Sequence, residues 1–274
     1  MIQSRREYLR LLSGALAGTA LSGIARAADP SAFTDTEKEK FLTSGKIVSL
    51  REIGHGVTKP MRAELEWNGS THAGSFQVVD KELPDFFPPG GKPIPMKDSW
   101  RYNIAAYRID RLLGLDMVAV TVPRPLQGKP AAISWWVDDV LFEEVDRIKQ
   151  NTEPPDPEAF DRQRALTRVF DELIINIDRN LANLLITKSW KIALIDHSRS
   201  FVPYHGIRNE ANLTRCSRGL LANMKRLTAG AVARVADTYL TTPQIQALIA
   251  RRDRIVGFFE KTALEKGEAN VMFS

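Results

Sequence analysis

The first half of the chain consists of short extended segments separated by turn residues. Between residues 46 and 80 the segments are KIVSLREIG, VTKPMRAELEWNG and THAGSFQVVD, with turn chemistry at Gly54-His55-Gly56 and Asn68-Gly69. This pattern predicts a small antiparallel sheet. Two later segments, MVAVTVPRP and AAISWWV, predict two more strands.

One stretch in this half is rich in proline, and a helix is predicted after it. LPDFFPPGGKPIPM, residues 83–96, holds five prolines and a Gly-Gly pair. Because proline removes a backbone donor, we expect a surface loop there. Asp98 or Ser99 can then cap a helix that ends at Gly114, with Ile104, Ile109, Leu112 and Leu113 at helical spacing.

From residue 156 onward the pattern becomes helical. Asp156-Pro157 is a cap followed by proline at the first helical position, and apolar residues recur at helical spacing from Phe160 to Ile174. Thr242-Pro243 opens a second long helix that ends near Gly267. Inside this half, NLLIT and KIALID are separated by three residues and predict a hairpin. The fold class is therefore α+β, with a sheet-rich part followed by a helix-rich part.

Composition narrows the function classes. The 274 residues are 43% hydrophobic and 26% charged, which is typical of a globular chain. Cys216 is the only cysteine, so an internal disulfide and a cysteine-rich metal cluster are excluded. The net charge is +5, of which residues 1–27 supply +3, and basic residues elsewhere are scattered. We therefore expect no nucleic-acid partner.

The N-terminal segment resembles an export signal. A basic head precedes an apolar stretch, Leu11–Ile24, which as a helix would reach only ~21 Å, short of the ~30 Å of a bilayer core. Ser4–Arg10 resembles the twin-arginine motif S-R-R-x-F-L-K. We expect cleavage after Ala27, a periplasmic or otherwise exported location, and no membrane anchor after cleavage. The alternative is a fortuitous basic amphipathic N-terminus.

Polar residues gather between the second-half helix and the hairpin. Asp178 and Asn183 are five residues apart in a predicted loop, and Asp196 follows the last hairpin strand. The hairpin should bring Asn183 and Asp196 side by side as an oxygen site for Mg²⁺ or Mn²⁺. Asp178 could then orient or deprotonate a hydroxyl. The structural alternative is that such Asp and Asn residues are only helix caps or turn residues.

This arrangement resembles the catalytic core of the protein-kinase-like superfamily, in its atypical branches. D-R-N-x-x-N and L-I-D-H-S are similar to motifs of phosphoinositide kinases, HipA-type kinases and Golgi casein-kinase-like secretory kinases. The resemblance implies a bilobal fold, ATP or another nucleotide with Mg or Mn as cofactor, and an unknown hydroxyl acceptor (protein, glycan or small molecule). It implies Asp178 as catalytic base, Asn183 and Asp196 as metal ligands, and Asn176, Arg179 and His197 as supporting residues.

The implied domain organisation has four parts. Residues 1–27 are the signal peptide, 28–45 a linker, 46–138 an N-lobe of sheet and one helix with a Pro-rich loop at 83–97, and 139–274 a helical C-lobe with the catalytic-like loop and hairpin at 176–199.

The resemblance extends upstream, with two departures. Gly54, Gly56 and Lys59 resemble the phosphate-covering loop. Gln77 and Asn103 stand where these kinases place a Lys–Glu ion pair, so both charges are absent. Lys59, Arg62 and Lys81 are candidates to replace the missing cation. Two alternatives to a phosphotransferase therefore stay open: a pseudokinase that binds or scaffolds without turnover, and a nucleotidyltransferase or hydrolase on the same fold.

Several other residues receive structural interpretations. Three arginines of the last long helix are predicted to form a solvated face, and Cys216 to be a packing residue. One residue of the pair Trp135-Trp136 is predicted in the core and the other at a surface or hinge.

Overall fold

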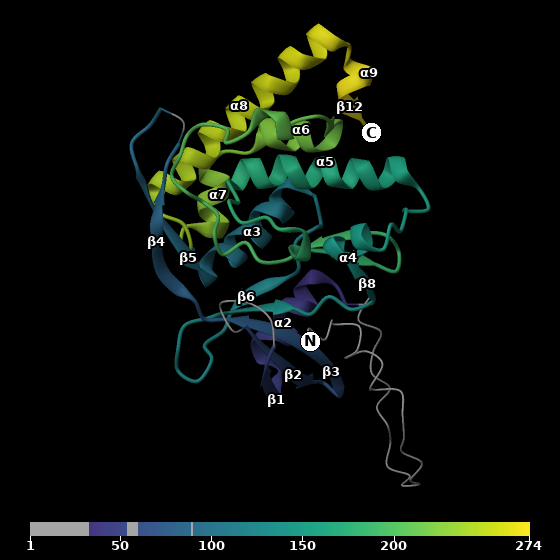
Figure 1. The fold of residues 1–274 in the computed structure, drawn as a ribbon. Coiled ribbons are helices and arrows are strands. Elements are labelled where there is room, and N and C mark those ends of the chain that lie inside the picture. The colour runs from purple at the N-terminus through teal and green to yellow at the C-terminus, as the bar shows by residue number, and fades with distance from the viewer. Residues whose placement is uncertain (1–32, 54–59, 89) are drawn as a thin grey trace.

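The structure is a computed structural model that describes residues 33–53, 60–88 and 90–274. Its N-terminal part is a five-stranded antiparallel sheet in the order β1-β2-β3-β7-β6 (Figure 1). The strands are β1 (Lys46–Glu52), β2 (Met61–Trp67), β3 (Ser70–Gln77), β6 (Thr121–Pro123) and β7 (Ala132–Trp135). All five predicted extended segments therefore form strands. The predicted export signal and the residues Gly54, Gly56 and Lys59 lie outside the described residues.

Helices dominate the C-terminal part, around a small second sheet (Figure 1). The helices are α4 (Glu144–Lys149), α5 (Pro157–Ile174), α6 (Arg218–Arg226), α7 (Ala229–Ala236), α8 (Thr242–Lys266) and α9 (Glu268–Val271), with 3-10 turns η2 (Leu181–Asn183) and η3 (Glu210–Asn212). The predicted hairpin is β9 (Leu184–Thr187) with β10 (Ile192–Leu194), and β8 (Val140–Glu143) adds a third strand beside β9. Residues of β11 (Cys216–Ser217) and β12 (Met272–Phe273) pair in parallel near the C-terminus.

The predicted helix boundaries are confirmed. α3 (Trp100–Leu113) begins after Ser99, whose side chain accepts from the Arg101 amide, and ends at Gly114 in the left-handed region at φ 65°. Asp156 caps α5. Leu112 is the exception to the predicted stripe of α3, because it is partly exposed. Among the described residues, every helix is too short or too polar to cross a bilayer.

The predicted linker at 28–45 is wrong in its second half, which forms helix α2 (Asp35–Ser44). Thr34 and Glu37 make a capping box at its start. Phe41 is fully buried and meets Trp67 and Trp135 edge-on, at ring-centroid distances of 6.0 and 5.5 Å. A short polar helix with one buried side gives only a weak hydrophobic periodicity in the sequence, which is why the helix was not predicted. In the structure, this helix packs against the five-stranded sheet.

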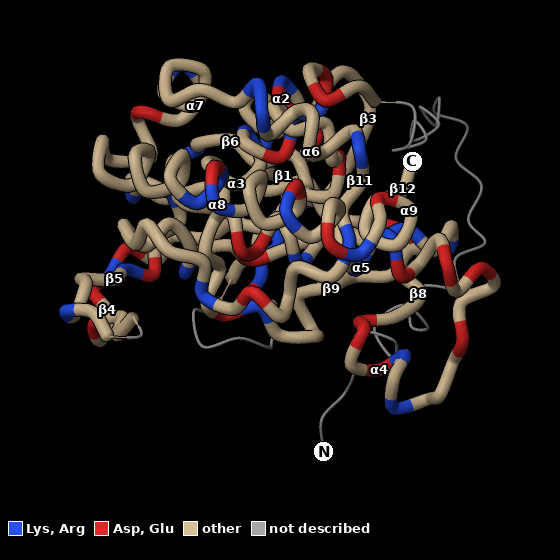
Figure 2. Tube along the Cα trace, turned by 90° about the horizontal axis from the view of Figure 1, so that it is seen from above, with Lys and Arg blue, Asp and Glu red and all other residues tan. Residues whose placement is uncertain are grey.

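The predicted Pro-rich loop at 83–97 is also wrong over much of its length. β4 (Asp80–Phe86) and β5 (Ile94–Ser99) form an antiparallel ribbon, which Figures 1 and 2 show at one edge of the molecule. The pairing shifts register between Leu83 and Phe86, which places Pro84 inside an irregularity of the ladder. A two-stranded ribbon has two free edges and tolerates prolines there that a central strand would not.

Arg251 of α8 is fully buried, so the predicted solvated face is wrong for this residue. Its Nε donates to the Leu173 carbonyl at 2.8 Å, and its Nη1 donates to the carbonyls of Val202, at 3.2 Å, and Tyr204. Burial lowers the pKa of the guanidinium to about 9, against a small opposite effect of Glu172. The side chain thus fastens α8 to the end of α5 and to the segment after β10.

Cys216 is buried, as predicted for a packing residue. Burial raises the pKa of its thiol to about 12, so the thiol stays protonated at neutral pH.

We expect Arg251→Leu to lower the free energy of unfolding by about 3–5 kcal/mol, because it leaves buried carbonyl groups without a donor. Urea denaturation of the full chain measures this. Arg254→Leu on the exposed side of the same helix is the matched control and should change stability by less than about 0.5 kcal/mol. Equal effects of the two substitutions would contradict the structural role of Arg251.

Candidate nucleotide and metal site

The loop after α5 is shaped by Asn176. The helix stops at Ile175, which adopts a left-handed conformation at φ 48°. Asn176 is buried, and its amide donates to Asp171 Oδ1 at 3.2 Å while its Oδ1 accepts from the Asp178 amide at 3.1 Å. These two bonds fix the direction in which the chain leaves the helix and place Asp178 at the start of the loop.

Arg179 joins the loop to the hairpin. Its guanidinium pairs with both oxygens of Asp171, at 2.9 and 3.0 Å, and donates to the carbonyls of Asn183 and Ile195 at 3.2 and 2.8 Å. The Ile195 amide also donates to the Asn183 carbonyl at 3.2 Å. Residues 183 and 195 are therefore adjacent, and Asn183 and Asp196 come side by side as the hairpin spacing predicted.

Asp196 follows β10 in an unusual backbone conformation. Its φ is 53°, a left-handed conformation that Asp adopts more readily than most residues. Its Oδ1 accepts from the Ser198 amide at 3.3 Å and from Gln77 Nε2 at 3.2 Å. The turn thus directs the carboxylate across to strand β3.

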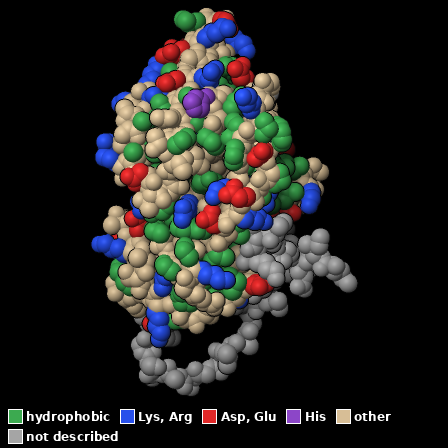
Figure 3. All heavy atoms as spheres, turned by 90° about the vertical axis from the view of Figure 1, so that its left-hand side faces the viewer, with side chains coloured by type: hydrophobic (Ala, Val, Ile, Leu, Met, Phe, Trp, Pro, Cys, Tyr) green, Lys and Arg blue, Asp and Glu red, His purple; other side chains and the backbone are tan. Residues whose placement is uncertain are grey.

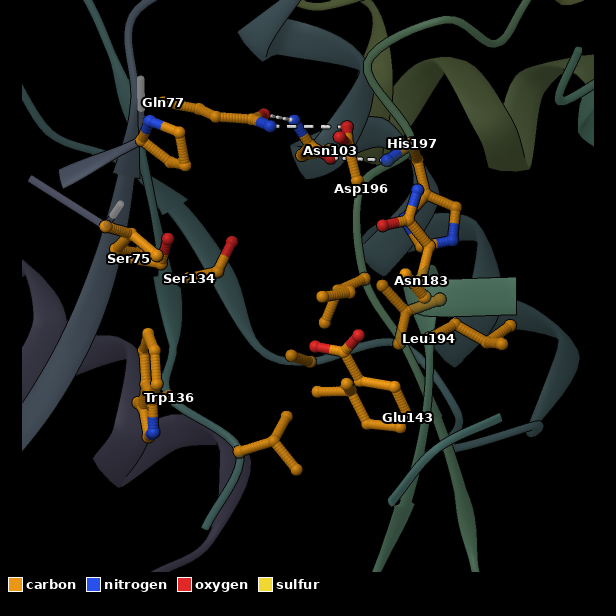
Figure 4. Close-up of a pocket in the computed structure, with 18 of the residues that line it drawn as sticks. Ser75, Gln77, Asn103, Ser134, Trp136, Glu143, Asn183, Leu194, Asp196 and His197 are labelled. Carbon is orange, nitrogen blue, oxygen red and sulfur yellow. Dashed lines mark hydrogen bonds between the residues drawn. The ribbon is translucent and has the colours of Figure 1, made fainter. Parts of the chain in front are cut away.

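Gln77 and Asn103 form a chain of amides that reaches Asp196, as Figure 4 shows. Asn103 Nδ2 donates to Gln77 Oε1, and Asn103 Oδ1 accepts from the His197 amide at 2.7 Å. The two residues occupy β3 and α3, so they lie together as predicted from their place in the sequence. Both amide side chains are neutral, however, so they supply hydrogen bonds but no positive charge.

His197 is buried beside the Gln77–Asn103 pair. Burial, and then the nearby charge of Arg179, lower its pKa well below 6.5, so the imidazole is neutral at pH 7. Its ring lies edge-on to Phe170 at 6.1 Å. The contact of His197 with Asn103 is made by its backbone amide and not by its ring.

A cavity of about 450 Å³ lies between the two parts of the protein, and Figure 4 shows residues on both of its walls. This volume is within the usual range for small-molecule sites. Gln77, Asn103, Asn183, Asp196 and His197 line one end.

The other end of the large cavity carries Ser75, Ser134, Trp136 and Glu143 (Figure 4). Trp135 is buried and stacked on His72 at a ring-centroid distance of 3.7 Å, whereas Trp136 is half-buried, so one tryptophan of the pair belongs to the core as predicted. Both residues line the cavity.

The predicted substitutes for the missing cation have other contacts. Arg62 pairs with Glu64 at 3.0 Å and lies over the Trp136 ring at 4.3 Å. Lys81 is exposed on the β4–β5 ribbon. Among the described residues that line the large cavity, the one cationic side chain is Lys149, at the end of α4. The described part of the lining therefore carries little positive charge.

A second, smaller cavity of about 290 Å³ adjoins the first. Asp178, Asn183 and Asp196, the three residues predicted to converge, all line it. Asn183 and Asp196 line both cavities and so stand where the two meet.

Asn180 lines the smaller cavity too, but its Oδ1 accepts from the amides of Ala182 and Asn183. For Asn180 the alternative of a helix cap is therefore correct.

Arg199 lines the smaller cavity, and no role was predicted for it from the sequence. Its Nε donates to Asp98 Oδ2 at 2.9 Å, and its Nη1 lies 3.0 Å from Asp178 Oδ2. The hydrogen bond from Arg199 to Asp98 raises the pKa of the guanidinium. Asp98, in turn, is fully buried at the end of β5. Through these contacts, Arg199 links the side chain of Asp178, the candidate base, to buried Asp98.

The donor set suits a hard divalent cation that takes further ligands from phosphate. Within the described ranges, no three His, Cys, Asp or Glu side chains come together as a metal cage. Asn183 and Asp196 instead offer one amide and one carboxylate at the mouth of a cavity. Mg²⁺ and Mn²⁺ in phosphate-transferring sites need few protein ligands, so the residues fit that group.

Two further residues escaped sequence reasoning. Asp171, the partner of Arg179, lies inside α5 and belongs to no motif. Glu143 lines the large cavity from β8, a strand that was not predicted. Only the three-dimensional arrangement identifies either residue.

Solved structures with the same fold exist, although no protein-family model matches the sequence and no curated protein matches it significantly. The chain is similar to hydra Fam20 with sugar, with a TM-score of 0.66 and 16% identity over 87% of this chain and 91% of that chain.

Two kinase structures are also similar. One is the Golgi casein kinase with Mn/ADP bound (TM-score 0.60, 13% identity, 87% of this chain and 78% of that one). The other is the Helicobacter pylori proinflammatory kinase CtkA (0.51, 13% identity, 82% and 98%). The chain therefore has a mixed α+β kinase-like fold, with an N-terminal antiparallel sheet and a helical C-terminal part.

Proposed function

We propose that the protein binds a nucleoside triphosphate with Mg²⁺ or Mn²⁺ in the large cavity and transfers its terminal phosphoryl group to a hydroxyl acceptor in the smaller one. The observation that carries the proposal is the meeting of Asn183 and Asp196 at the junction of the cavities, with Asp178 in the acceptor cavity. The Golgi casein kinase structure with Mn/ADP supports the choice of ligands.

Each residue has a defined task in this proposal. Asn183 and Asp196 would hold the divalent ion, whose chemistry is to neutralise charge on the transferring phosphoryl group. Asp178 would accept the proton of the acceptor hydroxyl. The hydroxyl oxygen would then bond to phosphorus while the bond between phosphorus and the leaving nucleoside diphosphate breaks. Gln77 would fix Asp196 through its 3.2 Å hydrogen bond. Such reactions depend mainly on positioning and charge stabilisation.

A second candidate is a nucleotide-binding or scaffold module without turnover. The neutral Gln77–Asn103 pair favours it, because an amide cannot neutralise phosphate as an ammonium does. The twin-arginine-like N-terminus supports the further proposal that the protein is exported, and ATP is scarce outside the cytoplasm. Nucleotidyl transfer is a third outcome, which product analysis distinguishes because the acceptor then carries a nucleotide instead of a phosphate.

Phosphotransfer is tested with the purified chain, ATP labelled at the terminal phosphate, and Mn²⁺. We expect label to enter the protein itself or an added hydroxyl acceptor. Asp178→Asn and Asp196→Asn should each reduce the rate by at least about a hundredfold, because each removes a group required in the transition state.

Asp139→Asn is the matched control for these substitutions. Asp139 is exposed, pairs with Lys188 at 2.7 Å and lines neither cavity, so its variant should keep the wild-type rate. An inactive wild type that still gains thermal stability from ATP and Mn²⁺ would favour the binding module over the enzyme.

The amide chain gives a separate prediction. Gln77→Lys places an ammonium within reach of Asp196 and of a bound phosphate, and we expect it to tighten ATP–Mn²⁺ binding by about tenfold, the difference between a neutral and a charge-assisted hydrogen bond. Isothermal titration calorimetry measures the change. Gln246→Lys, the same charge change on the exposed side of α8, should leave the affinity unchanged. Equal affinities of Gln77→Lys and wild type would argue against phosphates at this end of the cavity.

A further inference from the structure

The smaller cavity has an unusual lining. All of its residues are polar: Asp98, Asp178, Asn180, Asn183, Asp196, Ser198 and Arg199. A cavity of about 290 Å³ with such walls is suited to a small hydrophilic molecule or a single polar side chain. If the proposed function is correct, this is the acceptor site, and its lining then constrains the chemistry of the acceptor.

Asp98 provides the first constraint. The residue is fully buried, and its Oδ2 accepts from Arg199, but its Oδ1 has no hydrogen-bond partner in the described structure. A buried carboxylate oxygen without a donor is costly, and native structures seldom leave one unpaired. The unmatched oxygen therefore indicates a donor that belongs to a ligand.

The charge balance provides the second constraint. The cavity is lined by three carboxylates, Asp98, Asp178 and Asp196, against the single guanidinium of Arg199. The divalent ion proposed at Asp196 does not remove this surplus, because the nucleotide phosphates held with it carry negative charge of their own. A cationic acceptor would gain from the surplus, and an anionic acceptor would be repelled.

The third constraint is the spacing of the two carboxylates. One guanidinium, that of Arg199, contacts both Asp98 and Asp178, at 2.9 and 3.0 Å. The carboxylates are thus separated by no more than the span of one planar group. A molecule with an amine close to a hydroxyl could address both of them at once.

We propose that the acceptor carries a protonated amine close to the hydroxyl that receives the phosphoryl group, as in an amino sugar or amino alcohol. The ammonium donates to Asp98 Oδ1, and the hydroxyl lies at Asp178. Asp98 is then a specificity-determining residue contributed by the β4–β5 ribbon.

The test uses glucosamine, glucose and N-acetylglucosamine as probes of the full chain without nucleotide, by isothermal titration calorimetry at pH 7. These sugars differ only at carbon 2, where glucose carries a hydroxyl, glucosamine an amine and N-acetylglucosamine a neutral amide, so only glucosamine carries a positive charge. We expect glucosamine to bind at least tenfold more tightly than either of the others. Absence of glucosamine binding, or equal binding of glucosamine and glucose, would overturn the proposal.

Asp98→Asn should abolish the preference for glucosamine, because the amide removes the negative charge while its oxygen can still accept from Arg199. Asp85→Asn makes the same change at an exposed position of the same ribbon and should retain the preference. Urea denaturation checks that both variants are folded. A preference that survives in folded Asp98→Asn would assign the amine to another group and refute the role of Asp98.

The proposed function and this inference fail in distinguishable ways. ATP–Mn²⁺ binding involves the large cavity, and both this binding and the transfer of phosphate are measured separately from sugar binding. If the amine preference holds while no phosphate is transferred, the smaller cavity is an amine-binding site and the phosphotransfer proposal falls. If transfer occurs to neutral hydroxyl compounds without an amine preference, this inference falls alone.

Discussion

The site depends on the contacts of one guanidinium. Arg179 is held by both oxygens of Asp171 in α5 and donates to the backbone at Asn183 and Ile195. A bidentate pair fixes the plane of the arginine, so the two carbonyls are held with a defined geometry. The convergence of Asn183 and Asp196 follows from this clamp and the hairpin register rather than from any contact between their own side chains. A site built in this way is preorganised before a ligand arrives.

A second arginine, Arg251, fixes the same region to helix α8. Arg251 binds the carbonyl of Leu173, close to the end of α5, and those of Val202 and Tyr204, shortly after the Asp196 turn. The backbone itself joins these segments, because the Phe201 amide donates to the Ile174 carbonyl at 2.7 Å. The loop that carries Asp178 and the turn that carries Asp196 are therefore fixed to one framework, which α8 completes.

The neutral pair of Gln77 and Asn103 determines which contacts Asp196 receives from the N-terminal part. A Lys–Glu pair at positions 77 and 103 would bring a cation to Asp196, whereas Gln77 and Asn103 bring only dipoles. From this side Asp196 therefore receives only the neutral hydrogen bond of Gln77. Figure 3 shows acidic and basic side chains interspersed over the face that carries the β4–β5 ribbon. The local surplus of carboxylates is thus a property of the cavity and not of that whole surface.

The sequence predicts much of the fold and the central residues of the site because local rules govern them. Hairpin spacing placed Asn183 beside Asp196, and capping residues placed the ends of α3 and α5. Arg251 was misassigned because helical spacing separates faces of a helix but does not reveal what packs against each face. Asp171 itself belongs to no motif, and Arg199 binds Asp98, which is 101 residues away in the sequence, so no local pattern could identify either residue.

The error with the largest consequence for function concerns the prolines. A proline-rich stretch was expected to form a loop, yet Pro84 lies in an irregular part of a ribbon whose strands are otherwise paired. In the backbone ladder of this ribbon, Lys81 of β4 stands opposite Asp98 of β5. That pairing, together with the hydrogen bond from the Ser99 amide to the Ser198 carbonyl at 2.8 Å, brings Asp98 against the Asp196 turn. A surface loop over 83–97, as predicted, would leave the carboxylate of the adjoining Asp98 exposed to water, where it would have little influence on the choice of a ligand. The ribbon instead buries it, and burial is what makes its unmatched oxygen informative about the acceptor.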